Sequence, residues 1–189
     1  MSAGHLLTGT AVCATVRSGE NALQIGMWGV VFGCLLFAGI MDLRTCRVYR
    51  FIWWISGAAA MVLLWESRAG WGFSMWGLFA YCLLQELFFG RMYGRADCHA
   101  FCVCAAAGTS VGFTYRDYLL HMLLAFGMLA VVQLAKHNVN RKGNLTVPVP
   151  FLPYISISFL ILLFLFSQNY GCAVLLFLVS CICLKLRGA

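Results

Sequence analysis

The chain has 189 residues, of which 62% are hydrophobic and only 10% are charged. A water-soluble domain of this size usually has about a quarter of its residues charged, so the composition excludes an ordinary soluble protein. Repeated apolar runs without period-two alternation predict an all-α fold, a polytopic membrane helical bundle. The net charge of +7 is then interpreted as a topology signal, and we expect no nucleic-acid partner.

The apolar runs divide the chain into candidate spans with short connections. Residues 1–21 lack the basic start of a cleavable signal peptide, and we expect them to form an extracytoplasmic N-terminal segment. A single transmembrane domain is expected over 22–187. It contains seven candidate spans, at Ala22–Met41, Phe51–Trp65, Gly72–Phe89, Cys98–Phe113, Tyr118–Ala135, Phe151–Ser167 and Tyr170–Leu186. The last two alternatively form one bent helix, so six or seven transmembrane helices are expected.

Basic residues indicate the orientation of the spans. If the N-terminus lies outside and every span crosses, ten basic residues fall on one side: Arg44, Arg47, Arg50, Arg91, Arg95, Lys136, Arg141, Lys142, Lys185 and Arg187. Three fall on the other side: Arg17, Arg68 and Arg116. Cytoplasmic loops of membrane proteins carry the excess of Lys and Arg, so the first side is predicted to be cytoplasmic.

Two acidic residues lie at the ends of predicted spans. Asp42 follows the first span and Asp97 precedes the fourth, so the order of crossings places both carboxylates at the cytoplasmic end. Each has an alternative interpretation as a structural group. Asp97 is suited to cap the fourth helix, whereas Asp42 opposes the dipole of the first helix and would need Arg44 and Arg47 to offset its charge.

The pair of aspartates has a chemical interpretation. Two carboxyl groups a few ångströms apart cannot both ionise easily, so they share one proton. One member can then activate water as a base while the other polarises a carbonyl as an acid. This is the chemistry of aspartic proteases, which needs no cofactor and no metal.

Three motifs appear in order along the chain. They are AGIMDLRTCRVYRF at Ala38–Phe51, YGRADCHAF at Tyr93–Phe101, and VPVPFLPY at Val147–Tyr154. Together they resemble the motifs of type IV prepilin peptidases, which belong to the GxGD intramembrane aspartyl proteases. The resemblance covers most of the chain, from Ala38 to Leu160.

The resemblance implies roles for particular residues. Asp42 and Asp97 correspond to the two catalytic aspartates, and Gly94 corresponds to the first glycine of Gly-x-Gly-Asp. Ala96 replaces the second glycine, and His99 stands where lysine is common. These three neighbours of Asp97 are candidates for contact with the substrate.

The remaining motif positions differ in how closely they follow the family pattern. Val48–Arg50 replaces an Ile-Pro-Asn-like turn and so lacks its proline. Pro150 and Pro153 correspond to the proline-bearing segment before a late helix, and with Pro148 they are expected to shape the start of the sixth span. The family's cytoplasmic insert with paired C-x-x-C motifs is absent from this sequence, which indicates the short, peptidase-only branch.

The resemblance implies a membrane aspartic endopeptidase that cleaves the leader of a prepilin or pseudopilin. Its expected location is the bacterial or archaeal cytoplasmic membrane, with the lipid bilayer around it and the active site facing the cytoplasm.

Other interpretations of the same residues remain open. Asp42, Glu86 and Asp97 are also compatible with a relay in a small proton-coupled or cation-coupled transporter, and the departures from the motifs are compatible with a catalytically degenerate family member. Glu86 alone fits a hydrogen-bonded residue of the bundle. Cys98, His99 and Cys102 lack a fourth ligand for a metal, so the cysteines are interpreted as packing residues.

Overall fold

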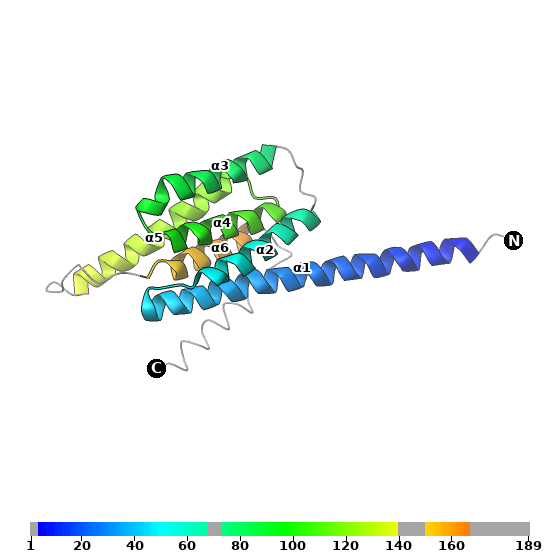
Figure 1. Ribbon diagram of the computed structural model, residues 1–189, viewed down its shortest axis with the longest axis horizontal. Helices are drawn as coiled ribbons and strands as arrows, with labels where there is room; N and C mark the ends of the chain where they lie inside the picture. Colours follow the sequence, from blue (N-terminus) through cyan, green and yellow to red (C-terminus); the bar gives the residue numbers. More distant parts are fainter. Residues whose placement is uncertain (1–3, 68–72, 140–149, 167–189) are drawn as a thin grey trace.

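The computed structural model describes residues 4–67, 73–139 and 150–166 of the chain (Figure 1). These residues form six α-helices and a short 3₁₀ turn: α1 (Gly4–Thr45), α2 (Arg50–Ser67), α3 (Phe73–Leu87), η1 (Phe89–Arg91), α4 (Arg95–Ser110), α5 (Tyr115–Val139) and α6 (Leu152–Phe166). No strand occurs within these ranges. The predicted all-α class is therefore confirmed for the described part of the chain.

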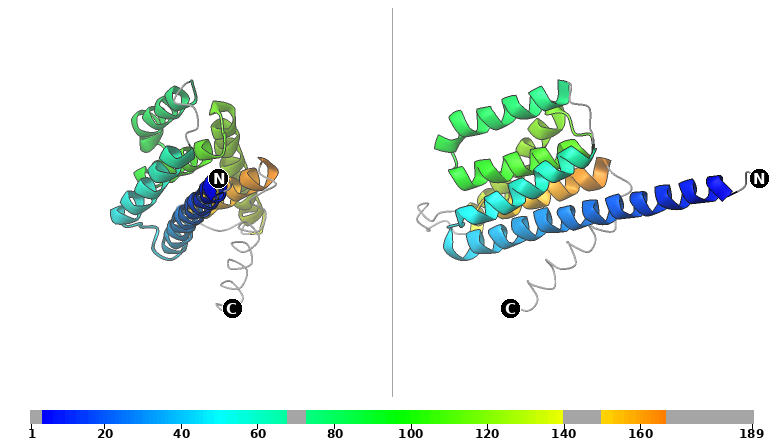
Figure 2. Two further views of the ribbon diagram at one scale, coloured as in Figure 1. Left: turned by 90° about the vertical axis from the view of Figure 1, so that its right-hand side faces the viewer. Right: turned by 45° about the vertical axis from the view of Figure 1, so that its right-hand side comes forward.

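The first helix is longer than the sequence predicted. The first span was expected to start at Ala22, after a separate segment 1–21, but α1 begins at Gly4 and runs unbroken to Thr45. No proline lies in this stretch to interrupt the helical hydrogen bonds. The N-terminal part of α1 extends beyond the other helices (Figures 1 and 2).

The next five predicted spans match α2 to α6 to within a few residues at each end. The seventh, Tyr170–Leu186, lies outside the described residues.

Helix α4 occupies the middle of the bundle. It packs against α1, α2, α3 and α6 (Figure 2). Its buried positions are mostly small: Ala100, Cys104, Ala105, Ala107 and Gly108. Small side chains allow helix backbones to approach closely, so the composition of α4 explains why several helices surround it.

Many large hydrophobic side chains lie on the outer surface of the bundle. Large hydrophobic side chains are exposed on several helices, including Phe37, Trp54, Trp76, Leu123 and Phe164. Two segments, Ala22–Thr45 and Tyr115–Ala135, are long and apolar enough to cross a membrane. Contiguous apolar surface of this extent favours contact with lipid or with a partner over contact with water.

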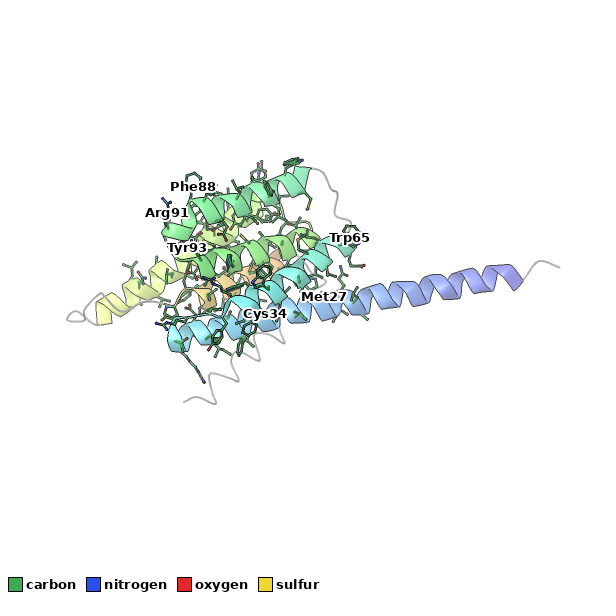
Figure 3. The ribbon with its side chains drawn as sticks, viewed as in Figure 1. Met27, Cys34, Trp65, Phe88, Arg91 and Tyr93 are labelled. Carbon is green, nitrogen blue, oxygen red and sulfur yellow. The ribbon has the colours of Figure 1, made fainter. Side chains whose placement is uncertain are left out.

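An aromatic cluster holds together the end of the bundle at which α4 and α6 begin. The ring of Tyr93 lies 5.9 Å from Phe101, 5.3 Å from Phe126 and 5.8 Å from Phe151, measured between ring centroids. Figure 3 shows Tyr93 at the opposite end of the bundle from Trp65. Because these rings come from α4, α5 and the residues just before α4 and α6, they fix where those two helices start.

Candidate active site

Asp42 lies near the end of α1 and contacts the start of α6. The backbone N–H of Leu152 donates a hydrogen bond to Asp42 Oδ2 at 3.1 Å. Leu152 is the first residue of α6, and the first N–H groups of a helix have no partner within the helix. A carboxylate at this position satisfies such a group and interacts favourably with the helix dipole.

Pro153 and Gly39 allow α1 and α6 to meet at this point. A Cβ on Gly39 would lie only 3.9 Å from Pro153 Cα, so the two backbones approach closely. Pro153 lies in the first turn of α6, where its missing N–H removes no helical hydrogen bond. Pro150 precedes the helix and is partly buried. Pro148 lies outside the described residues.

Asp97 lies in the first turn of α4, before the span predicted to begin at Cys98. The predicted cap was wrong: the residue at the N-cap is Gly94, and no side chain caps the helix there. Gly94 has φ 109°, a backbone conformation that disfavours residues with a Cβ. Ala96 follows in regular helix, so a second glycine is not needed for the backbone at that position.

The two aspartates lie close enough for their charges to interact. Burial of Asp97 raises its pKa, and the nearby charge of Asp42 raises it further, to about 7. The order of crossings predicted that both carboxylates lie at one end of the bundle, and this placement is confirmed. Both are partly buried rather than fully exposed.

The surroundings of the two carboxyl groups differ. Burial raises the pKa of Asp42, and the hydrogen bond from the Leu152 N–H opposes this rise because it favours the charged form. For Asp97, burial and the nearby charge of Asp42 both raise its pKa, which favours its neutral form. A pair with one ionised and one protonated member provides both a base and an acid near neutral pH.

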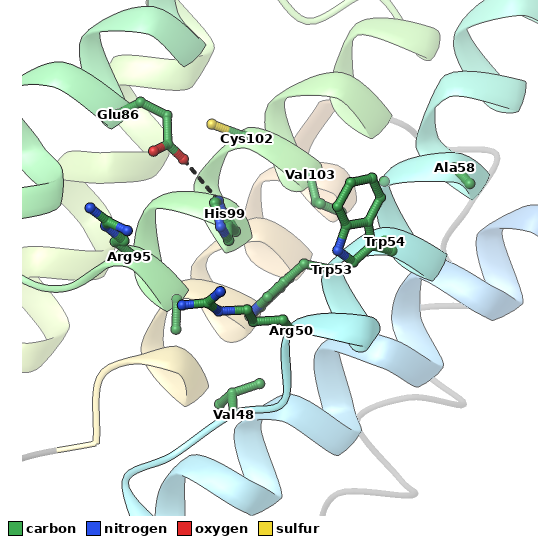
Figure 4. Close-up of a pocket in the computed structure, with 12 residues that line it drawn as sticks. Val48, Arg50, Trp53, Trp54, Ala58, Glu86, Arg95, His99, Cys102 and Val103 are labelled. Carbon is green, nitrogen blue, oxygen red and sulfur yellow. Dashed lines mark ion pairs between the residues drawn. The ribbon is translucent and has the colours of Figure 1, made fainter.

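His99 does not join the aspartate pair. Its Nδ1 lies 2.9 Å from Oε1 of Glu86, and its ring makes an edge contact with Trp53 at 6.3 Å between centroids. No hydrogen bond or ion pair within the described ranges links Glu86 to either aspartate. The Glu86–His99 pair therefore belongs to a separate groove between α2, α3 and α4 (Figure 4).

The two residues that follow Asp97, Cys98 and His99, each contact a group of α3. Cys98 Sγ lies 3.3 Å from the backbone oxygen of Gln85, and His99 pairs with Glu86. The described residues contain no group of three or more His, Cys, Asp or Glu side chains that could hold a metal ion.

Two positioning contacts at this site were missed by the sequence analysis. The first is the Leu152 N–H, because a backbone group leaves no trace in a pattern of residue types. The second is a partly buried link between Gln85 of α3 and Tyr93, whose hydroxyl donates to Gln85 Oε1. Since Tyr93 directly precedes Gly94, this link helps to fix the start of α4 and hence Asp97. The sequence signal for this hydrogen bond was the amide side chain of Gln85 within an apolar run.

Comparison with known proteins finds no match: no family model, curated protein or solved structure matches the chain.

Proposed function

We propose that this chain is an intramembrane aspartic endopeptidase of the prepilin leader peptidase type. The observation that carries the proposal is the pairing of Asp42 with Asp97, in which the pKa of Asp97 is raised to about 7 by burial and by the charge of Asp42. Perturbed carboxyl pairs of this kind are typical of catalytic sites. A structural ion pair joins opposite charges, so it does not account for two carboxyl groups whose charges repel each other.

In this proposal Asp42 is the base and Asp97 is the acid. The Asp42 carboxylate takes a proton from a water molecule, and the water oxygen attacks the carbonyl carbon of the scissile peptide bond. The protonated Asp97 donates its proton to the carbonyl oxygen, which gives a neutral geminal diol. When the diol collapses, the C–N bond breaks, the proton on Asp42 passes to the leaving amine, and one diol hydroxyl returns a proton to Asp97. No acyl-enzyme forms, since neither carboxylate attacks the substrate.

The proposed substrate is a prepilin or pseudopilin, which by the motif resemblance has a short basic leader before a hydrophobic helix. The apolar exterior of the bundle would lie in a cytoplasmic membrane and contact the helix of the substrate. The aspartates lie at one rim of the bundle, where an extended leader would reach them from the cytoplasm. A Cβ added at Gly94 would lie 3.5 Å from Asp97 Oδ2. The absence of a side chain at Gly94 therefore leaves room beside Asp97 for the backbone of the substrate.

Co-expression with a prepilin-like substrate tests the proposal, with leader removal followed by gel shift. We expect Asp42→Asn and Asp97→Asn each to abolish cleavage while the protein still inserts into the membrane. Asp117→Asn is the matched control, because Asp117 accepts hydrogen bonds from Thr114 at the start of α5 and has no catalytic role in the proposal. Retained processing in either active-site variant would contradict it. Loss of activity in Glu86→Gln with retention in both aspartate variants would favour the relay interpretation.

A further inference from the structure

A groove of about 790 Å³ lies on the side of α4 that faces α2 and α3 (Figure 4). It does not include Asp42 or Asp97. Its walls come from the N-terminal halves of α2 and α4, from the end of α3, and from Val48 in the connection before α2. It includes Ala96 and His99, which the motif resemblance made candidates for contact with the substrate, but no proton transfer of the proposed hydrolysis uses the groove.

The groove is charged at one end and apolar further along. Arg50 and Arg95, the first residues of α2 and α4, line the end where these helices begin. Beyond them the lining is apolar or small, with Gly57, Ala58 and Val103. Arg50 and Ala58 are separated by eight residues of helix, which corresponds to about 12 Å along the axis. The polarity of the groove therefore changes over roughly half the length of an acyl chain.

The charges at the polar end favour an anionic ligand. Within the described part of the chain, neither Arg50 nor Arg95 forms an ion pair with a carboxylate. The acidic group in the lining, Glu86, is already paired with His99 at 2.9 Å. Figure 4 shows the Arg50 side chain extending toward the start of α4, where Arg95 and His99 lie. Arginine is well suited to phosphate, because its planar fork can donate two parallel hydrogen bonds.

The apolar part of the groove indicates what is attached to the anion. Trp54 lies at its edge with 80% of its surface exposed, and tryptophan is common at the interface between lipid tails and headgroups. A free phosphate ion bound by the arginines would not contact the apolar lining at Gly57, Ala58 and Val103. Basic pockets between transmembrane helices commonly bind the headgroups of anionic lipids.

We propose that this groove binds an anionic phospholipid, with the phosphate between Arg50 and Arg95 and an acyl chain along Gly57, Ala58 and Val103. The proposal requires the bundle to lie in a membrane but does not depend on hydrolysis, so Asp42→Asn protein is expected to bind the lipid as the unchanged chain does.

The test measures lipid binding to the purified full chain in a neutral detergent, by native mass spectrometry and by thermal shift. Phosphatidylglycerol is expected to bind at least about tenfold more tightly than phosphatidylcholine, and Arg50→Gln with Arg95→Gln should remove this preference. Arg44→Gln with Arg47→Gln is the matched control, because both arginines are exposed near the same end but do not line the groove. This control should keep the preference.

Gly57→Leu provides a second variant that leaves both arginines in place. A Cβ on Gly57 meets no atom within 4 Å, so a leucine there extends into the groove without disturbing the fold and should weaken phosphatidylglycerol binding. Glycerol phosphate, which lacks acyl chains, should not bind.

Three results would overturn the proposal. The first is equal binding of both lipids, and the second is glycerol phosphate binding as tightly as the lipid. The third is an Arg50→Gln, Arg95→Gln variant that keeps the lipid preference but loses leader cleavage, since the groove would then serve the peptide.

Discussion

The carboxylate of Asp42 accepts a hydrogen bond from the backbone N–H of Leu152 at 3.1 Å, although the two residues are 110 positions apart in the chain. This contact joins the end of α1 to the start of α6 and holds Asp42 beside Asp97. A single side chain therefore has a structural role and a proposed chemical role, and suitable substitutions separate the two.

Replacing Asp42 with alanine or with asparagine distinguishes the two roles. Alanine leaves the Leu152 N–H without its acceptor, whereas asparagine keeps an oxygen in the same place. We expect Asp42→Ala to be less stable than Asp42→Asn by about 1–2 kcal/mol, as for the loss of a helix cap. Thermal or denaturant unfolding in detergent measures the difference. Equal stability of the two variants would show that the hydrogen bond contributes nothing.

Cleavage is expected to decline as the pH rises through about 7. The pKa of Asp97 is raised to about 7 by burial and by the charge of Asp42, so above that pH the pair loses its shared proton and its acid. A profile of the initial cleavage rate from about pH 5 to about pH 9 measures the decline, with unfolding followed over the same range as a control. A rate that keeps rising to the alkaline limit, in protein that stays folded, would exclude Asp97 as the acid.

Asp97→Asn is expected to change how stability depends on pH. The folded chain holds the Asp97 proton more tightly than the unfolded chain, because the pKa is about 7 instead of the usual 3.8. The resulting stabilisation is fully present below about pH 4 and is lost as the pH rises through about 7. Asparagine mimics the protonated form of Asp97. Near pH 8 the free energy of unfolding of the variant should therefore exceed that of the unchanged chain by up to about 4 kcal/mol.

Near pH 4 the unchanged chain and Asp97→Asn should have similar unfolding free energies. A constant difference across the pH range would mean that Asp97 has an ordinary pKa in the folded protein.

Gly94→Ala is expected to impair both folding and cleavage. Gly94 has φ 109°, which costs a residue with a Cβ roughly 1–2 kcal/mol, and the added Cβ would lie 3.5 Å from Asp97 Oδ2. Gly112→Ala is the matched control, because Gly112 has φ 95° with nothing within 4 Å of a Cβ. Both variants should lose similar stability, whereas only Gly94→Ala should lower the cleavage rate of the folded fraction. Equal rates in the two variants would argue against any role of Gly94 at the site.

The helices were largely predictable from the sequence, because apolar runs of near-spanning length leave few alternatives to a helical bundle. The beginning of α1 was not predicted, since the polar stretch Arg17–Asn21 resembles a break although it contains no proline. Hydropathy reports the preferred environment of a segment, whereas helix continuity depends on backbone hydrogen bonds that polar residues can also make.

The candidate site was predictable only in part. The order of crossings placed Asp42 and Asp97 at one end, because each crossing reverses the direction of the chain. Contacts between distant helices leave no local pattern in the sequence. The hydrogen bond from Leu152 to Asp42 and the pairing of Glu86 with His99 were therefore not predicted. The cap expected at Asp97 failed for a local reason: Gly94 already occupies the N-cap.

Infrared titration of the carboxyl groups tests the shared proton most directly. In the unchanged chain a carboxylic-acid band should disappear as the pH rises through about 7, the raised pKa of Asp97, and Asp97→Asn should lack that band. In Asp42→Asn the band should disappear at a lower pH, because the negative charge that raises the pKa of Asp97 is gone. A band that titrates at the same pH in the presence and absence of the Asp42 charge would contradict the pairing of these two residues.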